Sequence, residues 1–246
     1  MEPVYRSAIV ASRLMFAVQG LRVTVDGAEH VPRDGGAVLA ANHIGYLDFI
    51  FAGLAARPAG RLVRFMAKQE VFAHPVAGPL MRGMRHIPVD RTAGAASFRA
   101  AVRALRDGEM VGVFPEATIS RSFELKEFKS GTVQMAAAAG VPIVPVAIWG
   151  SQRLWTKDHP KRLGRSGVPI ALRAGPPIEV GRREVELAGE RLRAELTALL
   201  HAAQQGYPPL PPSEAAFCPA RLGGRAPSPA EAARLDEAEA ERRAAR

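Results

Sequence analysis

Short apolar segments alternate with helix-like segments along most of the chain, and this alternation constrains the fold more than any other feature. The apolar segments read as short strands and span residues 21–25, 37–41, 62–67, 85–89, 110–114, 143–148 and 168–174. Helical patterns cover residues 46–56, 95–106, 132–139 and 184–201. This order predicts an α/β fold with a mixed, largely parallel sheet flanked by helices.

The ends of the chain differ in character from its centre. We expect an N-terminal amphipathic helix over residues 1–20 and one domain over residues 21–205. The whole chain of 246 residues is 48% hydrophobic and can therefore bury a substantial core. Residues 206–246 begin with a proline-rich stretch and continue rich in Ala, Glu and Arg. Such a composition predicts a disordered tail, extended over 206–228 and at most transiently helical over 229–246.

Residues 4–21 mix apolar side chains with Arg6, Ser12, Arg13 and Gln19. This periodicity predicts a helix that lies in a membrane interface or, equally, packs on the domain. Arg13 interrupts the longest apolar stretch, which is shorter than the roughly 20 residues of a membrane-spanning helix. The same interruption argues against a signal peptide.

The segment 41–48 places His43 five positions before Asp48 in an otherwise apolar stretch. A neutral imidazole becomes a general base when a carboxylate holds one ring nitrogen protonated and leaves the other free. On a regular helix the two side chains would lie about 140° apart and about 7.5 Å along the axis. We therefore expect His43 in a loop and Asp48 in the first helical turns beyond it. Taken alone, the pair is also compatible with a structural histidine that has an acidic neighbour by chance.

Three further blocks follow in the chain. They read GMRHIPVDR, VFPEATISR and VPIVPVA and occupy residues 83–91, 113–121 and 141–147. Together with 41–48, their order and spacing resemble the glycerolipid acyltransferases that act at membrane surfaces, typified by 1-acylglycerol-3-phosphate (lysophosphatidic acid) acyltransferase. The resemblance covers roughly residues 20–180 and implies an enzyme of phospholipid synthesis.

The resemblance implies roles for individual residues. His43 would be the general base and Asp48 would orient it. Arg91 ends the second block and would lie near the acceptor phosphate, which suits a guanidinium because its planar fork donates two parallel hydrogen bonds. A solvated loop arginine is the alternative for Arg91. Lys68 stands at a position often basic in relatives and could bind the phosphate or the donor, although a solvated lysine is commoner.

The third block matches the family at Glu116, Thr118 and Ser120 but departs from the usual Glu-Gly-Thr-Arg-Ser. Ala117 restricts backbone angles that glycine would allow, and Ile119 removes the expected cation.

Two charged residues of this block are candidate acceptor contacts. Arg121 follows two positions after the missing cation and can replace it from another direction. Glu116 can bind a glycerol hydroxyl, with a structural ion pair to Arg91 or Arg121 as the alternative. We expect Glu116, Thr118 and Arg121 to help position the acceptor. The fourth block reads as a buried strand that shapes the site.

The net charge of +9 implies an anionic partner. No base-stacking motif or recognition helix is visible, so an anionic membrane surface is favoured over nucleic acid. The single cysteine, Cys218, cannot form an intrachain disulfide or a zinc cluster by itself, and we expect no metal or cofactor. These features predict a peripheral protein on the cytoplasmic face of the membrane.

The expected reaction is direct acyl transfer from acyl-CoA or acyl carrier protein to the free hydroxyl of 1-acylglycerol-3-phosphate. The chain has no Gly-x-Ser-x-Gly motif, and Cys218 lies outside every block, so no acyl-enzyme is expected. Residues 65–84 contain Met and Phe side chains that could line a groove for the acyl chain or simply pack in the core. Alternatives are another lysophospholipid or glycolipid acceptor, thioester hydrolysis, or lipid binding without catalysis.

Overall fold

A seven-stranded sheet forms the centre of the protein in this computed structural model, which describes residues 2–90 and 94–244. The strand order is β1-β7-β6-β2-β5-β3-β4. The strands are β1 (Arg22–Asp26), β2 (Ala37–Ala41), β3 (Val63–Lys68), β4 (Ile87–Val89), β5 (Met110–Val113), β6 (Ile143–Trp149) and β7 (Pro169–Ala174). All pairs of these strands are parallel except β6 with β7, which confirms the predicted mixed, largely parallel sheet.

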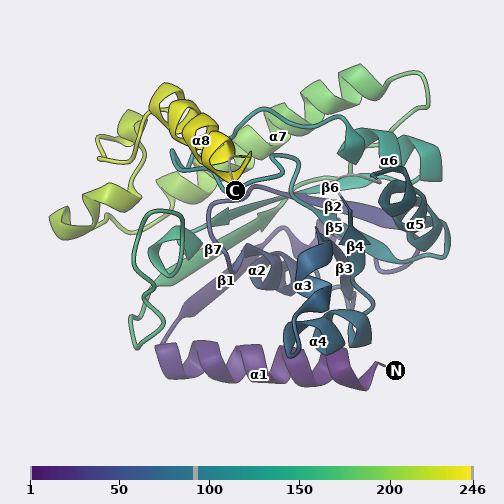
Figure 1. Ribbon diagram of the computed structural model, residues 1–246, viewed down its shortest axis with the longest axis horizontal. Helices are drawn as coiled ribbons and strands as arrows, with labels where there is room; N and C mark the ends of the chain where they lie inside the picture. The colour runs from purple at the N-terminus through teal and green to yellow at the C-terminus, as the bar shows by residue number, and fades with distance from the viewer. Residues whose placement is uncertain (1, 91–93, 245–246) are drawn as a thin grey trace.

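Helices cover both faces of the sheet (Figure 1). One face carries α1 (Pro3–Gln19), α2 (Asp48–Ala55), α3 (Gln69–Ala73) and α4 (Ala77–Gly83). The other carries α5 (Gly94–Arg106), α6 (Gly131–Ala139) and α7 (Val185–Gln205). The predicted helices α1, α2, α5, α6 and α7 are confirmed within a few residues at each end, whereas the short helices α3 and α4 were not predicted.

Burial explains why the central strands read as continuous apolar runs. Every residue of β2, β5 and β6 is buried, because helices pack on both faces of these strands. Phe16 of α1 stacks on Phe51 of α2 within the core on one face, and Leu105 of α5 and Leu196 of α7 lie in the core on the other.

The strands β6, β2, β5 and β3 are neighbours and run parallel to one another. Their carboxyl ends therefore meet at one edge of the sheet, where open α/β folds place ligands.

The N-terminal helix both packs on the domain and exposes an apolar stripe. Tyr5 is buried and its hydroxyl donates to the carbonyl of Val63 at 2.8 Å. On the other side of α1, Val10, Leu14 and Val18 are each about two-thirds exposed. Among the described residues, no helix is both long and apolar enough to cross a bilayer.

The C-terminal segment departs from the predicted disordered tail. It contains two short 3-10 helices, η3 (Pro212–Phe217) and η4 (Ala220–Leu222), and the helix α8 (Pro229–Ala244). Aromatic packing holds its first part, since Tyr207 and Phe217 are buried in a cluster with Trp149. The tail thus returns to the domain, and α8 lies on the same side of the sheet as α7 (Figure 1).

Candidate active site

His43 lies in the loop after β2, and Asp48 is the first residue of α2. The Nδ1 atom of His43 is 3.0 Å from Oδ2 of Asp48, which confirms the expected loop-to-helix pairing. The same Oδ2 accepts the backbone N–H groups of Ile44 at 2.6 Å and Gly45 at 2.7 Å. The Asp48 side chain is fully buried, while that of His43 is 20% exposed.

This arrangement fixes the proton on one side of the imidazole. Because the carboxylate of Asp48 can only accept, the His43 tautomer consistent with the network carries its proton on Nδ1. The Nε2 atom then has a free lone pair that can take a proton from a hydroxyl. The His43 ring also stacks on Phe114, with centroids 4.1 Å apart, and this contact restricts its rotation.

The sequence did not reveal Ser151 as a partner of this pair. Ser151 is fully buried at the start of the short 3-10 helix η2 (Ser151–Arg153) that follows β6, and its Oγ donates to Oδ1 of Asp48 at 2.5 Å. Asp48 therefore accepts hydrogen bonds on both carboxylate oxygens. The only sequence signal for Ser151 is its place directly after Gly150 at the end of the fourth block's strand.

Within the described residues, which exclude Arg91, Glu116 binds backbone N–H groups and forms no ion pair with Arg121. It is buried in the turn after β5, and its two oxygens accept the backbone N–H groups of His43 at 2.8 Å and Lys126 at 3.0 Å. Burial raises the pKa of its carboxyl to about 8, although both hydrogen bonds act in the opposite direction. Glu116 thus ties the loop that carries His43 to the loop that follows the third block.

Residues 22–149, slightly more than half of the chain, match the family model described as Acyltransferase. The chain belongs to the acyltransferase family. The resemblance found in the four blocks is therefore confirmed, and the protein is an enzyme of this type.

Two curated relatives illustrate the match of this acyltransferase to known proteins. The first, from Bacillus subtilis (strain 168), is 33% identical over 147 residues, which cover 59% of this chain and 71% of that protein. The second, from Borreliella burgdorferi, is 28% identical over 165 residues, which cover 65% of this chain and 63% of that protein. Both are named 1-acyl-sn-glycerol-3-phosphate acyltransferase, and the chain spans less than two thirds of the second.

A solved structure shares the fold of this acyltransferase. It is that of PlsC, the 1-acyl-sn-glycerophosphate acyltransferase from Thermotoga maritima, with a TM-score of 0.65 at 23% sequence identity. The match covers 80% of this chain and 78% of that one.

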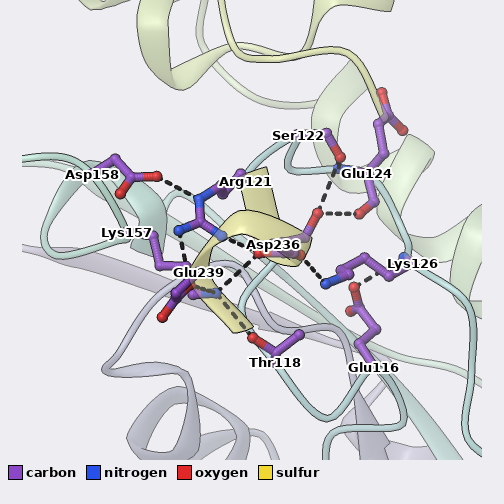
Figure 2. Close-up of polar contacts among 11 residues, drawn as sticks. Glu116, Thr118, Arg121, Ser122, Glu124, Lys126, Lys157, Asp158, Asp236 and Glu239 are labelled. Atoms are coloured by element: carbon purple, nitrogen blue, oxygen red, sulfur yellow. Dashed lines mark hydrogen bonds and ion pairs between the residues drawn. The ribbon is translucent and has the colours of Figure 1, made fainter. Parts of the chain in front are cut away.

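The predicted acceptor contacts lie in different environments. Thr118 is partly buried, and its hydroxyl accepts a hydrogen bond from Nζ of Lys157 at 3.1 Å. Arg121 is almost fully buried and is bound by Asp158, Asp236 and Glu239, of which the last two belong to α8 (Figure 2).

The other two predicted acceptor contacts lie outside the third block. Lys68 is the last residue of β3 and is exposed at the edge of the sheet where the strands' carboxyl ends meet. Arg91 lies outside the described residues.

Ala117 shows how this acyltransferase keeps the shape of the third block without the usual glycine. Its φ is +57°, in the left-handed region that the sequence led us to regard as closed to it. A Cβ there costs about 1–2 kcal/mol. The surrounding hydrogen bonds therefore hold Ala117 in a conformation that glycine would adopt more easily.

An apolar cavity of about 660 Å³ lies between α1, α2 and α4. Tyr5, Phe49, Phe65, Leu80 and Met84 are among its lining residues. Phe65 stacks on Phe114 with centroids 6.2 Å apart, and Phe114 in turn stacks on His43. A continuous row of rings thus connects the wall of the cavity with the imidazole.

Proposed function

We propose that this acyltransferase moves a fatty acyl group from acyl-CoA or acyl carrier protein to the free hydroxyl of 1-acylglycerol-3-phosphate, in the synthesis of phosphatidic acid. The single observation that carries the proposal is the geometry of His43, whose Nδ1 is held by buried Asp48 and whose Nε2 is left to act as a base. The names of the curated relatives support this choice of acceptor.

In the proposed reaction, the acceptor hydroxyl oxygen attacks the thioester carbonyl carbon while Nε2 of His43 takes the hydroxyl proton. The new C–O bond forms, the C–S bond breaks, and the thiolate leaves as the imidazolium returns the proton to it. Asp48 stabilises the transient positive charge on His43 throughout. The products are a diacylated glycerol phosphate and the free thiol of the donor.

The apolar cavity supports an acyl substrate. Its lining includes Phe65, Leu80 and Met84 of the segment 65–84, in which we expected an acyl groove, and its wall reaches the base through Phe65 and Phe114. We propose that it holds an acyl chain, since burying each methylene of the chain contributes about 0.8 kcal/mol. Arg91, Thr118, Arg121 and Lys68 remain the proposed contacts for the acceptor's glycerol phosphate, together with Glu116 as organiser of the loop.

The exposed stripe of α1 supports a peripheral position on an anionic membrane. Val10, Leu14 and Val18 recur every four residues and form one face of the helix, and Val76 and Leu80 add exposed apolar side chains near α4. Arg6 and Arg13 are exposed on the same helix. Apolar insertion combined with a net charge of +9 suits the cytoplasmic leaflet, whose surface is negative.

The test is release of free thiol from a long-chain acyl-CoA by the purified protein, with and without lysophosphatidic acid. We expect release that depends on the acceptor and that disappears in His43→Ala. The matched control is His201→Ala in α7, which should retain activity. A parallel assay uses acyl carrier protein as donor.

Other results would point to the alternatives. Thiol release without any acceptor would indicate a hydrolase, and release only with another lysophospholipid or a glycolipid would change the acceptor. A third result would be a wild type that binds lipid yet shows no turnover with either donor and any acceptor, and whose lipid binding survives His43→Ala. This result would indicate a non-catalytic lipid-binding protein and refute the proposal.

A further inference from the structure

Three basic side chains converge near the end of the third block. They come from loops that also form hydrogen bonds with the loop that carries His43. Arg121 follows Ser120, whose backbone N–H donates to the carbonyl of His43 at 2.7 Å. Lys157 follows Thr156, whose hydroxyl donates to the carbonyl of Ile44 at 2.7 Å.

The third cation is attached to the same loop through Glu116. The backbone N–H of Lys126 binds one Glu116 oxygen, while that of His43 binds the other. Arg121, Lys126 and Lys157, hereafter the cationic cluster, are thus each anchored within one residue of a hydrogen-bond network that includes the backbone of His43 or Ile44.

In this structure, the carboxylates of α8 occupy the cationic cluster (Figure 2). Asp236 contacts all three cations, with its Oδ1 3.2 Å from Nζ of Lys157. Glu239 lies 2.9 Å from both Nη2 of Arg121 and Nζ of Lys157. These two residues are one helical turn apart, so a single face of α8 presents both charges to the domain.

Charge accounts for most of the contact between α8 and the cationic cluster. Among the side chains of α8 that the structure describes, only Ala232 is buried, and Leu235 is 42% exposed. The helix start is fixed by Ser228 and Glu231, which bond reciprocally in a capping box. An anion of suitable charge and geometry can therefore replace α8 without exposing a large apolar surface.

We propose that the cationic cluster is a phosphomonoester site and that α8 is an internal competitor, whose Asp236 and Glu239 occupy the site in place of a phosphate. This proposal rests on the proposed function, in which the acceptor carries a glycerol phosphate and coenzyme A carries a ribose phosphate. A phosphomonoester has a charge of about −1.5 to −2 near pH 7 and three acceptor oxygens, which matches the charge of the two carboxylates. Thr118 adds a hydroxyl at the edge of the site, bound to Lys157.

The competition has a measurable consequence. When a site is open for only a fraction of the time, the apparent dissociation constant of its ligand rises by the inverse of that fraction. Removing the two carboxylates should therefore tighten the binding of a phosphomonoester even though α8 never contacts the ligand.

The experiment compares the full-length wild type with Asp236→Asn/Glu239→Gln. The matched control is Glu237→Gln/Glu241→Gln, which removes the same charge from exposed positions of the same helix. Binding of glycerol 3-phosphate and, separately, of coenzyme A is measured by titration calorimetry, without any acyl transfer. Circular dichroism verifies that each variant is folded.

We expect the Asp236/Glu239 variant to bind a phosphomonoester about tenfold tighter, a change of about 1.4 kcal/mol, and the control to bind as the wild type does. A gain for glycerol 3-phosphate assigns the cluster to the acceptor, and a gain confined to coenzyme A assigns it to the ribose phosphate of the donor. Equal affinity in the wild type and both variants would overturn the proposal. Because binding is read directly, this outcome is distinct from a failure of catalysis.

Discussion

The buried carboxylate of Asp48 holds Nδ1 of His43 at 3.0 Å and is itself held by Ser151 from a strand end 103 positions further along the chain. With the backbone N–H groups of Ile44 and Gly45, this gives Asp48 four hydrogen-bond partners. These four hydrogen bonds fix the position of the buried carboxylate, which in turn keeps the imidazole in one orientation.

Asp48→Asn should lower kcat by about 10²–10⁴-fold, the usual contribution of general base catalysis, with little change in affinity for lysophosphatidic acid. The amide lacks the negative charge that stabilises the imidazolium and can hold the wrong tautomer. Steady-state rates and acceptor binding measure the two effects separately. Binding lost in parallel with the rate would show that Asp48 shapes the pocket rather than assists His43.

Ser151→Ala should reduce the free energy of unfolding by about 1.5–3 kcal/mol, since it removes a buried hydrogen bond to a charged group. The rate should fall less than in Asp48→Asn, because Asp48 retains its bond to His43. Denaturant titration measures the stability. Ser166→Ala serves as control, since its buried hydroxyl has no hydrogen-bond partner in the part of the chain that the structure describes, and its removal should cost less.

The raised pKa of Glu116 predicts that the free energy of unfolding depends on pH. Its pKa is about 8 in the folded protein against an ordinary value of 4.5, so between these values the folded state binds one more proton than the unfolded state. The stabilisation that Glu116 contributes is therefore fully present below about pH 4.5 and is lost as the pH rises through 8, by about 1.4 kcal/mol per pH unit at most.

Urea titrations of the wild type and Glu116→Gln at several pH values test this expectation. The variant should be less stable at low pH, because its amide N–H₂ faces one of the two backbone donors, but its stability should depend less on pH. An unchanged slope between pH 5 and 8 would contradict the raised pKa.

Ala117→Gly should stabilise the protein by up to about 1 kcal/mol, because relief of the left-handed strain exceeds the added entropy of the unfolded chain. The comparison is Ala100→Gly, at an exposed position inside α5, which should destabilise by about 1 kcal/mol. Thermal unfolding distinguishes the two signs. Equal destabilisation in both variants would show that Ala117 is not strained.

Replacing Val10, Leu14 and Val18 together by Ser should weaken binding to anionic vesicles at least tenfold, since each side chain contributes about 1.5 kcal/mol or more when buried in lipid. Replacing the exposed Leu163, Leu187 and Leu222 by Ser is the matched control and should leave binding unchanged. Co-sedimentation with vesicles measures both. Equal losses would mean that α1 has no special part in membrane binding.

Local patterns predicted most of the elements and the pairing of His43 with Asp48, because these features depend on neighbours in the chain. The apolar runs of β2, β5 and β6 and the five-residue spacing of His43 and Asp48 are of this kind. The helix α8 could also have been predicted locally, because Ser228 and Glu231 form a capping box and Pro229 stands at the first helical position. Composition alone had suggested disorder there.

The sequence by itself determined the α/β architecture and the family, and it predicted the pairing of His43 with Asp48, since hydrophobic periodicity and motif spacing can be read along the chain. Only the tertiary structure decided the partners of these residues: Ser151 for Asp48, two backbone N–H groups for Glu116, and the carboxylates of α8 for Arg121. Such contacts join segments that are far apart in the chain. They follow from the order of the strands and the path of the tail, which no local pattern specifies.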